Sequence, residues 1–291
     1  MRKSHRTLPW PAGIGILAFS LGVAFAHPAG AASPKSPLKL GYEVYLGGLN
    51  IFYFDADLAF DGDRYVISGG GKTKGLARLM WRWAVQAKAS GILNGSGVES
   101  RAYNVSTLRK KKHKLMRLAF KESGAYAVER TPPDSPRKRK RRNLPKAVPH
   151  GTLDPISVSL AVAGALARGG SCGGKFPIFD GNRRYDLTFK KVGQEYLAKP
   201  GYSTFSGQAI RCQFAMDRIS GFRKRQRVVL RFWDDEETQL PQVWMARLKS
   251  GLPMVPVQFQ AEFNMGYMII YLSKAEYGGR PLLEAQRRAT K

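Results

Sequence analysis

Segments rich in β-forming residues, separated by turn signals, fill the chain from Leu38 onward, and this pattern constrains the fold most. The first segment, 38–46, ends at the turn Gly47-Gly48. β-Forming residues continue over 49–60 and end at Asp61-Gly62-Asp63, after which a third segment begins. Gly-Gly and Asp-Gly pairs between such segments are typical of β-hairpins. The sequence therefore predicts an antiparallel meander.

The same pattern continues along the chain and leaves room for few helices. A short helix is expected near 75–83, where Leu76, Leu79 and Trp83 have helical spacing. Further strands are expected over 64–68, 84–93, 98–108, 113–121, 125–131, 176–179, 184–191, 204–218, 227–233, 242–248, 255–263 and 267–272. A chain with this balance of elements belongs to the mostly β class.

A longer helix is expected near 155–168. Asp154 is a favourable N-cap residue, Pro155 suits the first helical position, and Gly169-Gly170 ends the helix. Apolar side chains lie almost all around this helix, so we expect it to be buried. A mostly β chain with one buried helix must pack its sheet on itself. We therefore predict one large, curved antiparallel sheet, as an open barrel, a β-roll or a sandwich, with this helix covering its core.

The first 31 residues have the features of a secretory signal peptide. Basic residues near the start precede an uncharged apolar stretch over 12–26. Ala29-Gly30-Ala31 fits the small-residue cleavage pattern, and Ala24-Phe25-Ala26 fits it too. The apolar stretch is shorter than the roughly 20 residues of a membrane-spanning helix, and an uncleaved anchor is the alternative. We expect residues 1–31 to be removed on export to the periplasm and 32–37 to form a linker.

Cys172 and Cys212 are the two cysteines of the chain, and both follow the predicted signal peptide. In an oxidising compartment such a pair is most simply a structural disulfide, whereas a reactive dithiol usually has C-x-x-C spacing. The bond closes a loop of about 40 residues, which the chain-entropy model values at roughly 4 kcal/mol. We therefore predict a disulfide between these two cysteines.

The chain is strongly basic, with 48 Lys and Arg against 21 Asp and Glu and a net charge of +27. Residues 101–150 alone hold 16 basic and 3 acidic residues. Such a surface attracts polyanions, which for an exported chain are membrane lipids and not nucleic acid. We expect an anionic membrane surface or lipid as the partner, and another envelope protein as a second class. The predicted basic patch comprises Arg109, Lys110, Lys111, Lys112, Lys114, Arg137, Lys138, Arg139, Lys140, Arg141 and Arg142.

Part of this basic patch lies in a segment of unusual composition. Prolines bracket the basic run 137–142 on both sides. Because prolines and like charges pack poorly, we predict an exposed, basic, Pro-rich loop over 132–150. The rest of 38–275 is expected to form a single β-rich domain, and 276–291 a basic C-terminal tail.

Several short motifs resemble catalytic or ligand-binding sites without the required context. Gly71-Lys72-Thr73 matches only the end of a phosphate-binding loop, so we interpret it as a hairpin turn. Residues 169–173 match G-x-S-x-G, but a helix precedes them and a strand follows, the reverse of the hydrolase order. His113 and His150 have no second ligand nearby, and the acidic run 234–237 lacks EF-hand spacing. We therefore expect no metal and no cofactor.

A set of residues in a fixed order is similar to one known family. Asp154-Pro155-Ile156-Ser157 opens the longer helix, and Cys172 follows it. Next come Phe179-Asp180-Gly181-Asn182-Arg183-Arg184-Tyr185-Asp186 and then Cys212 in a strand. With Tyr42-Glu43-Val44-Tyr45-Leu46-Gly47-Gly48-Leu49 near the start, this order resembles the periplasmic proteins catalogued as domain of unknown function 3108. The resemblance implies an exported envelope protein with a curved, mostly antiparallel sheet. That family has no agreed activity, so the resemblance implies no catalytic residues.

We expect the residues of this motif to be structural or to contact a ligand. Asp180-Gly181 has turn chemistry, and Arg183, Arg184 and Asp186 suit a charge-assisted cluster at the sheet rim. The residues concerned are Asp154, Pro155, Ser157, Phe179, Asp180, Gly181, Arg183, Arg184, Tyr185 and Asp186.

The favoured hypothesis is a non-enzymatic envelope protein. Its curved sheet would enclose an apolar groove for a lipid, and its basic patch would face a membrane. Two alternatives stay open. One is a scaffold that binds another envelope protein by strand addition at a sheet edge. The other is a carboxylate-dependent hydrolase of an envelope substrate, which requires Asp180 and Asp186 to face one cleft.

Overall fold

The computed structural model describes residues 36–95, 97–137, 144–198, 203–222, 239–263 and 266–283. Several sequence predictions fall outside these ranges. They are the signal peptide over 1–31, most of the linker 32–37, residues 138–142 of the basic patch, the strand 227–233, the acidic run 234–237, and the end of the tail 276–291.

The described residues form β-strands and two named helices, as the sequence predicts. The helices are α1 (Ala77–Met80) and α3 (Val158–Gly169). The strands are β1 (Leu38–Leu46), β2 (Leu49–Asp61), β3 (Arg64–Thr73), β4 (Trp83–Asn94), β5 (Gly97–Arg109), β6 (Lys112–Phe120), β7 (Tyr126–Thr131), β8 (Lys175–Phe179), β9 (Arg184–Leu197), β10 (Gly207–Ser220), β11 (Gln242–Arg247), β12 (Met254–Phe263), β13 (Gly266–Tyr277) and β14 (Arg280–Pro281).

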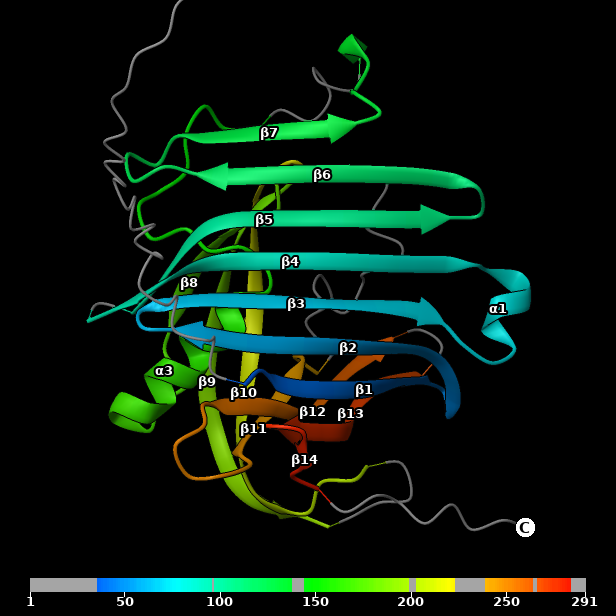
Figure 1. The fold of residues 1–291 in the computed structure, drawn as a ribbon, viewed down its shortest axis with the longest axis vertical. Helices are drawn as coiled ribbons and strands as arrows, with labels where there is room; N and C mark the ends of the chain where they lie inside the picture. Colours follow the sequence, from blue (N-terminus) through cyan, green and yellow to red (C-terminus); the bar gives the residue numbers. More distant parts are fainter. Residues whose placement is uncertain are drawn as a thin grey trace, which may run out of the picture. The chain divides into compact units, whose positions relative to one another are not determined.

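These strands make one antiparallel sheet, which confirms the predicted fold class. The strand order is β7-β6-β5-β4-β3-β2-β1-β13-β12-β11-β10-β9-β8, and β14 pairs with β13. Strands β2 to β7 lie side by side in the foreground of Figure 1, and β9 and β10 run behind and across them. The sheet therefore bends back on itself, so that both arms contribute side chains to a common core.

The two edges of the sheet approach each other through side chains. Phe179 at the end of β8 is fully buried and lies 4.6 Å from the ring of Tyr126 on β7, measured between centroids. Leu118 of β6 packs in the same cluster. Among the described strands no backbone ladder joins β7 to β8, so the sheet is open. The outer edge of β8 pairs instead with Leu153, whose N–H donates to the Pro177 carbonyl at 2.8 Å.

Helix α3 covers the core and is attached to the sheet by the predicted disulfide. It packs against β12 and β5. Cys172 follows the helix and is bonded to Cys212 of β10, and both cysteines are buried beside Leu166 and Met245. Gly170 ends the helix with a left-handed backbone, at φ 65°, as the sequence indicates. Residues 169–173 therefore form the end of a helix and contain the disulfide-bonded Cys172, without the strand-turn-helix order of a nucleophile elbow.

Both helices are shorter than predicted. Helix α3 begins at Val158, because the Asp154 carboxylate accepts the N–H groups of Ile156 and Ser157 and stabilises a turn before the helix. Helix α1 ends before Trp81, whose extended backbone at φ −153° leads into β4. Asp154 and Pro155 therefore belong to the turn that precedes α3 and not to its first helical turn.

The basic Pro-rich segment 132–150 is only partly an exposed loop. Val148 is buried beside Leu118, and its N–H donates to the Gly124 carbonyl at 2.9 Å. The Tyr126 hydroxyl donates to the Pro145 carbonyl. The segment therefore packs at its C-terminal end, where its residues are apolar and its charge is low.

The C-terminal strands extend past residue 275. Strand β13 continues to Tyr277, and the short strand β14 pairs with its end. The Leu282 N–H donates to the Ala275 carbonyl at 2.8 Å, and the side chains of Leu282 and Leu283 pack against the core. The first part of the predicted tail therefore belongs to the domain, because it supplies apolar residues beside a strand.

Candidate functional site

A cavity of about 410 Å³ lies inside the bend of the sheet, beside the start of α3. Side chains of β1 to β4 form one wall, and side chains of β11 to β13 form another. Residues 155, 156, 159 and 160 close the third side. Its volume is within the range of roughly 300–1,000 Å³ that small-molecule sites occupy.

The cavity is apolar because alternate residues of its strands point inward. On β2 these residues are Phe52, Phe54, Ala56 and Leu58. The ring of Phe54 stacks on that of Tyr42 from β1, with the centroids 4.7 Å apart. The Tyr42 hydroxyl donates to the Pro256 carbonyl at 3.0 Å, so it adds little polarity to the wall.

A glycine run in β3 makes room for these aromatic rings. A Cβ added at Gly71 would lie 2.5 Å from the ring of Phe52, so only glycine permits that ring to cross the strand. Gly69 and Gly70 line the cavity directly. The interpretation of Gly71-Lys72-Thr73 as a hairpin turn is wrong, because these residues continue the ladder of β3 with β2. Gly71 has a packing role, because it leaves room for the Phe52 ring.

The motif Asp154–Ser157 fixes the third wall of the cavity through a buried polar network. Asp154 is fully buried, and its Oδ2 accepts the hydroxyl of Ser100 on β5 at 2.8 Å. The Ser157 hydroxyl donates to the same oxygen at 2.5 Å. Oδ1 accepts the N–H groups of Ile156 and Ser157 at 2.9 and 3.0 Å. These bonds hold Pro155 and Ile156 where they line the cavity.

Tyr65 of β3 completes this network from the opposite side. Its hydroxyl donates to the Ser157 oxygen at 2.8 Å. Burial is the main cause that raises the pKa of Tyr65 to about 12. The hydroxyl therefore keeps its proton throughout the neutral range and remains a donor. A carboxylate buried without such donors would be strongly destabilising.

The second part of the motif forms the corner where the edges of the sheet meet. The Asp180 Oδ1 accepts the N–H groups of Asn182 and Arg183 at 2.7 and 2.6 Å, which is the predicted turn chemistry. Gly181 has φ +77°, and a Cβ there would lie 2.6 Å from the sulfur of Met116 on β6. Its carbonyl accepts a hydrogen bond from Arg130 of β7. The turn thus contacts both β6 and β7.

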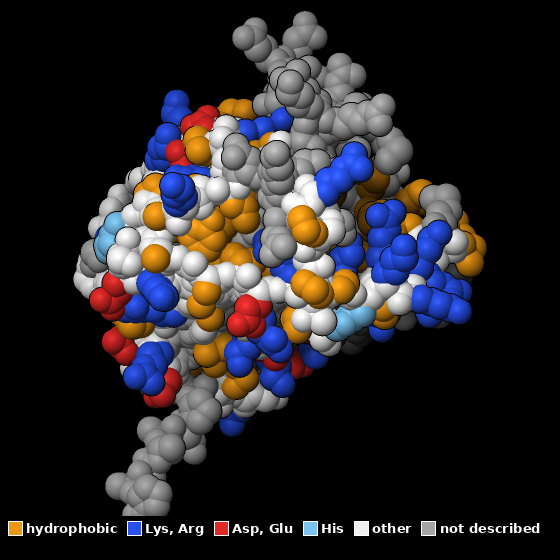
Figure 2. All heavy atoms as spheres, turned by 90° about the horizontal axis from the view of Figure 1, so that it is seen from above, with side chains coloured by type: hydrophobic (Ala, Val, Ile, Leu, Met, Phe, Trp, Pro, Cys, Tyr) orange, Lys and Arg blue, Asp and Glu red, His pale blue; other side chains and the backbone are white. Residues whose placement is uncertain are grey.

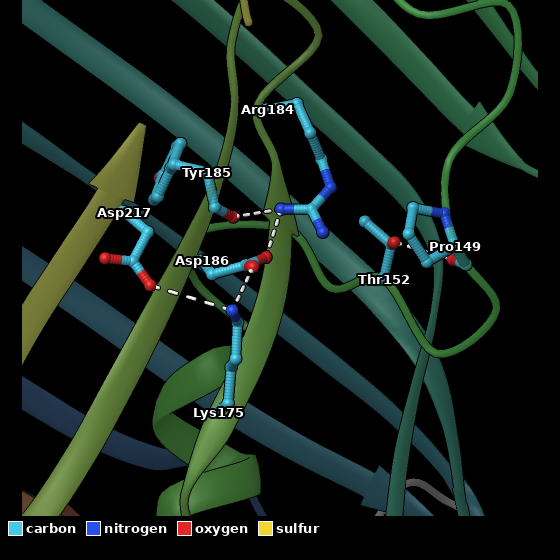
Figure 3. A network of polar contacts seen from close by, with 7 residues as sticks. All are labelled: Pro149, Thr152, Lys175, Arg184, Tyr185, Asp186 and Asp217. Carbon is cyan, nitrogen blue, oxygen red and sulfur yellow. Dashed lines mark hydrogen bonds and ion pairs between the residues drawn. The ribbon is translucent and has the colours of Figure 1, made fainter. Parts of the chain in front are cut away.

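A charged cluster lies at the base of this corner (Figure 3). Arg184 and Lys175 converge on the Asp186 carboxylate, with the Lys175 Nζ 2.9 Å from Oδ2. Lys175 also lies 3.6 Å from Asp217 of β10. The guanidinium carbon of Arg183 lies 5.5 Å from the centre of the Phe222 ring. The ion-pair cluster therefore joins Arg184 and Asp186 of β9 with Lys175 of β8 and Asp217 of β10.

Because of this cluster, we expect the free energy of unfolding to fall as the pH becomes acidic. Burial alone would raise the pKa of Asp186, but the hydrogen bonds and charges of Lys175 and Arg184 outweigh it, so the pKa lies below its usual value. Asp186→Asn is expected to lower the free energy of unfolding at neutral pH by about 1–3 kcal/mol. The wild-type advantage should persist above about pH 4 and vanish as pH falls through the folded pKa.

Urea unfolding of both proteins over a pH series measures this prediction. Asp217→Asn is the matched control, because the Asp217 side chain is 60% exposed and its pair with Lys175 is screened. Equal losses in the two variants, or a difference that persists in acid, would contradict the assignment.

A known protein family matches the sequence of this chain. The model of the family described as protein of unknown function DUF3108 matches residues 41–272. The chain belongs to the DUF3108 family. Both cysteines, Asp154–Ser157 and the corner motif lie within the matched residues. No curated protein matches the chain, and no solved structure matches it.

In this DUF3108 domain the two carboxylates of the hydrolase hypothesis have separate structural partners. Asp180 holds the turn and borders a polar cavity of about 490 Å³ with Arg130 and Arg183. Asp186 pairs with Lys175 of the neighbouring strand β8 and with Arg184 of its own strand, β9. Of these two carboxylates, Asp180 lines this polar cavity and Asp186 does not. Among the described residues no group of three or more His, Cys, Asp or Glu side chains is placed to hold a metal ion.

The described part of the predicted basic patch lies on the surface of the DUF3108 domain. Residues 109–112 and Lys114 are exposed at the turn between β5 and β6, and Arg137 is exposed after β7. The disulfide is compatible with export. Within the described ranges, no helix has the length and hydropathy to cross a membrane.

Sequence reasoning missed the residues that form the cavity and its polar support. Tyr65 and Ser100 are single polar residues in strands, and their sequence shows no signal for a contact with Asp154. The inward residues of β2 carried a usable signal, because Phe52, Phe54, Ala56 and Leu58 alternate with other side chains. That alternation identifies a buried face but cannot reveal that the face borders an empty volume.

Proposed function

We propose that this protein is an exported, non-enzymatic envelope protein that binds an apolar ligand, such as the acyl chain of a lipid, in the cavity. The observation that carries the proposal is the cavity itself. Its wall is built mainly from aliphatic and aromatic side chains of both arms of the sheet, and Asp55 is the one Asp, Glu, Lys, Arg or His among its described lining residues. Such a wall offers no set of converging polar groups for a polar substrate.

The energetics favour a hydrocarbon chain. Burying one methylene group contributes about 0.8 kcal/mol, so a long chain gains substantial binding energy from contact area alone. Phe52, Phe54, Val85 and Ala87 are only half-buried, so the cavity is accessible from their side. A hydrocarbon chain that enters there would cover these side chains.

The predicted location agrees with this ligand class. The sequence features of a signal peptide and the disulfide both support an oxidising compartment outside the cytoplasm. A protein in the periplasm meets lipids at two membranes. We therefore favour the envelope lipid pool as the source of the ligand.

The first experiment is native mass spectrometry of the protein purified without detergent from an exporting bacterial host, followed by solvent extraction. We expect a bound apolar molecule at a stoichiometry near one. A mass that matches the bare chain, together with no binding of an added fluorescent fatty acid, would overturn the proposal.

Ala87→Trp tests whether the ligand occupies this cavity. Ala87 is half-buried on β4 and lines the cavity, so an indole there fills the volume that a ligand needs. We expect fatty-acid binding to fall by about tenfold or more, because several methylene contacts are lost. Fluorescence titration with a soluble fatty-acid probe measures the effect.

Ala119→Trp is the matched control, since Ala119 is exposed on β6 and outside the cavity. It should bind the probe like the wild type. Val85→Trp provides a second test at another position of the same wall. Normal binding by both wall variants, with unchanged thermal unfolding, would place the ligand elsewhere.

The scaffold function has one observation in its favour. Strand β7 pairs with β6 on one side, and no described strand pairs with its other side. A partner strand is able to add at such an edge. Recovery of one envelope protein in a pull-down, resistant to high salt, would support this function if the cavity proves empty.

A further inference from the structure

Exposed apolar side chains are concentrated at one end of the sheet. At this end, called the α1 end, lie the β1–β2 turn, the start of β13 that is hydrogen-bonded to it, the segment 74–82 that contains α1, and the β5–β6 turn. Leu76 and Leu79 are 71% and 80% exposed. Six of the ten exposed large hydrophobic side chains of the described residues lie at this end: Leu49, Leu76, Leu79, Trp81, Leu108 and Tyr267. Single exposed leucines are common, but such a concentration marks an interaction surface.

The α1 end is also strongly basic. Residues 72–82 hold four Lys or Arg, residues 109–114 hold five, and neither segment contains Asp or Glu. All nine of these cations are exposed. Lys74 pairs with Glu43 at 2.7 Å. In Figure 2, Lys and Arg side chains form a dense group at the right, next to hydrophobic side chains, on the side where α1 lies in Figure 1.

The two basic segments adjoin each other. The Lys110 N–H donates to the Arg82 carbonyl at 3.2 Å, and Arg109 pairs with Trp83 in the ladder of β4 and β5. The exposed apolar side chains of 74–82 therefore stand beside the cations of the β5–β6 turn. This combination of inserted apolar groups and flanking Lys and Arg is the one that interfacial membrane-binding segments use.

A series of aromatic rings connects the α1 end with the cavity. Trp81 at the surface lies 6.3 Å from Trp83, measured between ring centroids, and Trp83 lies 5.1 Å from Phe52. Phe52 lines the cavity. Tryptophan is enriched where proteins meet the membrane interface, because its ring is apolar and its N–H is polar. The exposed end of this series thus has the chemistry of a membrane contact.

We propose that the α1 end docks on an anionic lipid bilayer, with Leu76, Leu79 and Trp81 entering the boundary between headgroups and acyl chains. The Lys and Arg of 72–82 and 109–114 bind the lipid phosphates. Docking in this orientation places the Phe52 side of the cavity next to the bilayer, where an acyl chain can move between membrane and protein. The inference deepens the proposed function and rests on it for the role of docking, though vesicle binding is measured independently.

Sedimentation with large vesicles tests the proposal. We expect the protein to bind vesicles of phosphatidylcholine with about one third phosphatidylglycerol, and to bind pure phosphatidylcholine far more weakly. Leu76→Asp with Leu79→Asp should weaken binding to the anionic vesicles about tenfold or more, because the inserted apolar area is lost. Lys110→Glu with Lys111→Glu should weaken it to a similar degree and reduce its salt dependence.

Matched controls separate this surface from general charge and hydrophobicity. Ile219→Asp changes an apolar side chain that is 58% exposed on β10. Lys190→Glu with Lys191→Glu reverses two exposed charges on β9. Both controls should bind vesicles like the wild type. Equal losses in variants and controls would show that only the overall charge attracts the membrane and would overturn the proposal, as would normal binding by the Leu76 and Leu79 variant.

Binding of a soluble fluorescent fatty acid distinguishes the two proposals. The α1-end variants should keep wild-type fatty-acid binding, since they leave the cavity wall intact. A wild type that binds anionic vesicles but no fatty acid would contradict the proposed function and leave the docking surface standing. A wild type that binds the fatty acid but no anionic vesicles would contradict the docking surface alone, and an acidic protein would then be the partner class to test.

Discussion

Replacing Asp154 by alanine is expected to lower the free energy of unfolding by about 3–5 kcal/mol, because it leaves several buried donors without an acceptor. The hydroxyls of Ser100 and Ser157 and two backbone N–H groups all donate to this carboxylate. Urea unfolding measured by circular dichroism gives the change. Since a typical domain has only about 5–15 kcal/mol of stability, much of the variant should be unfolded under mild denaturing conditions.

Two companion variants define what the measurement means. Asp217→Ala removes an exposed carboxylate and should cost less than about 1 kcal/mol. Asp154→Asn keeps one carbonyl oxygen for the two N–H groups, so its loss should be smaller than that of the alanine variant. If Asp154→Ala is as stable as Asp217→Ala, the network does not stabilise the start of α3.

Removing the disulfide is expected to have an effect of similar size. Cys172→Ala with Cys212→Ala should lower the free energy of unfolding by about 4 kcal/mol in the chain-entropy model, because the bond closes a loop of 40 residues. The loss of two buried sulfur atoms beside Leu166 and Met245 adds to the cost. Equilibrium unfolding in urea, with and without a reducing agent, measures both contributions.

The reduced wild type is the natural control for this variant. Reduction removes the covalent bond and keeps the sulfur atoms, so the difference between reduced wild type and the alanine variant reports packing alone. The double variant should show no response to the reducing agent. A loss below about 1 kcal/mol would mean that the bond constrains the unfolded chain little.

The fold class was predictable because its signals are local. The turn residues after Leu46 and Phe60 divide the early strands. The chain has only two cysteines, so a disulfide could form only between Cys172 and Cys212. The start of α3 was not, since Asp154 bonds to the backbone of a turn as readily as to that of a helix. Whether the sheet closes was also unpredictable, because it depends on how Phe179 and Tyr126 pack across its edges.

The corner motif was recognised from the sequence, whereas the cavity was not. Asp180 and Gly181 act within a few residues of each other, so local chemistry identifies their turn. The cavity combines β1, β4, α3 and β12, which lie far apart in the sequence. The exposure of Leu76 and Leu79 was likewise hidden, because their helical spacing is the same on a surface as in a core.

The position of β1 has a consequence for how the polypeptide acquires its structure as it is made. β1 is the first of the described strands to be synthesised, and it lies at the centre of the sheet between β2 and β13. The hairpins from β1 to β7 can assemble early, but one backbone edge of β1 has no partner until β13 is complete. Nascent chains with such an unpaired edge are prone to aggregate, and pairings so distant in sequence form slowly. The described sheet is therefore completed only when β1 pairs with β13, which is made more than 200 residues later.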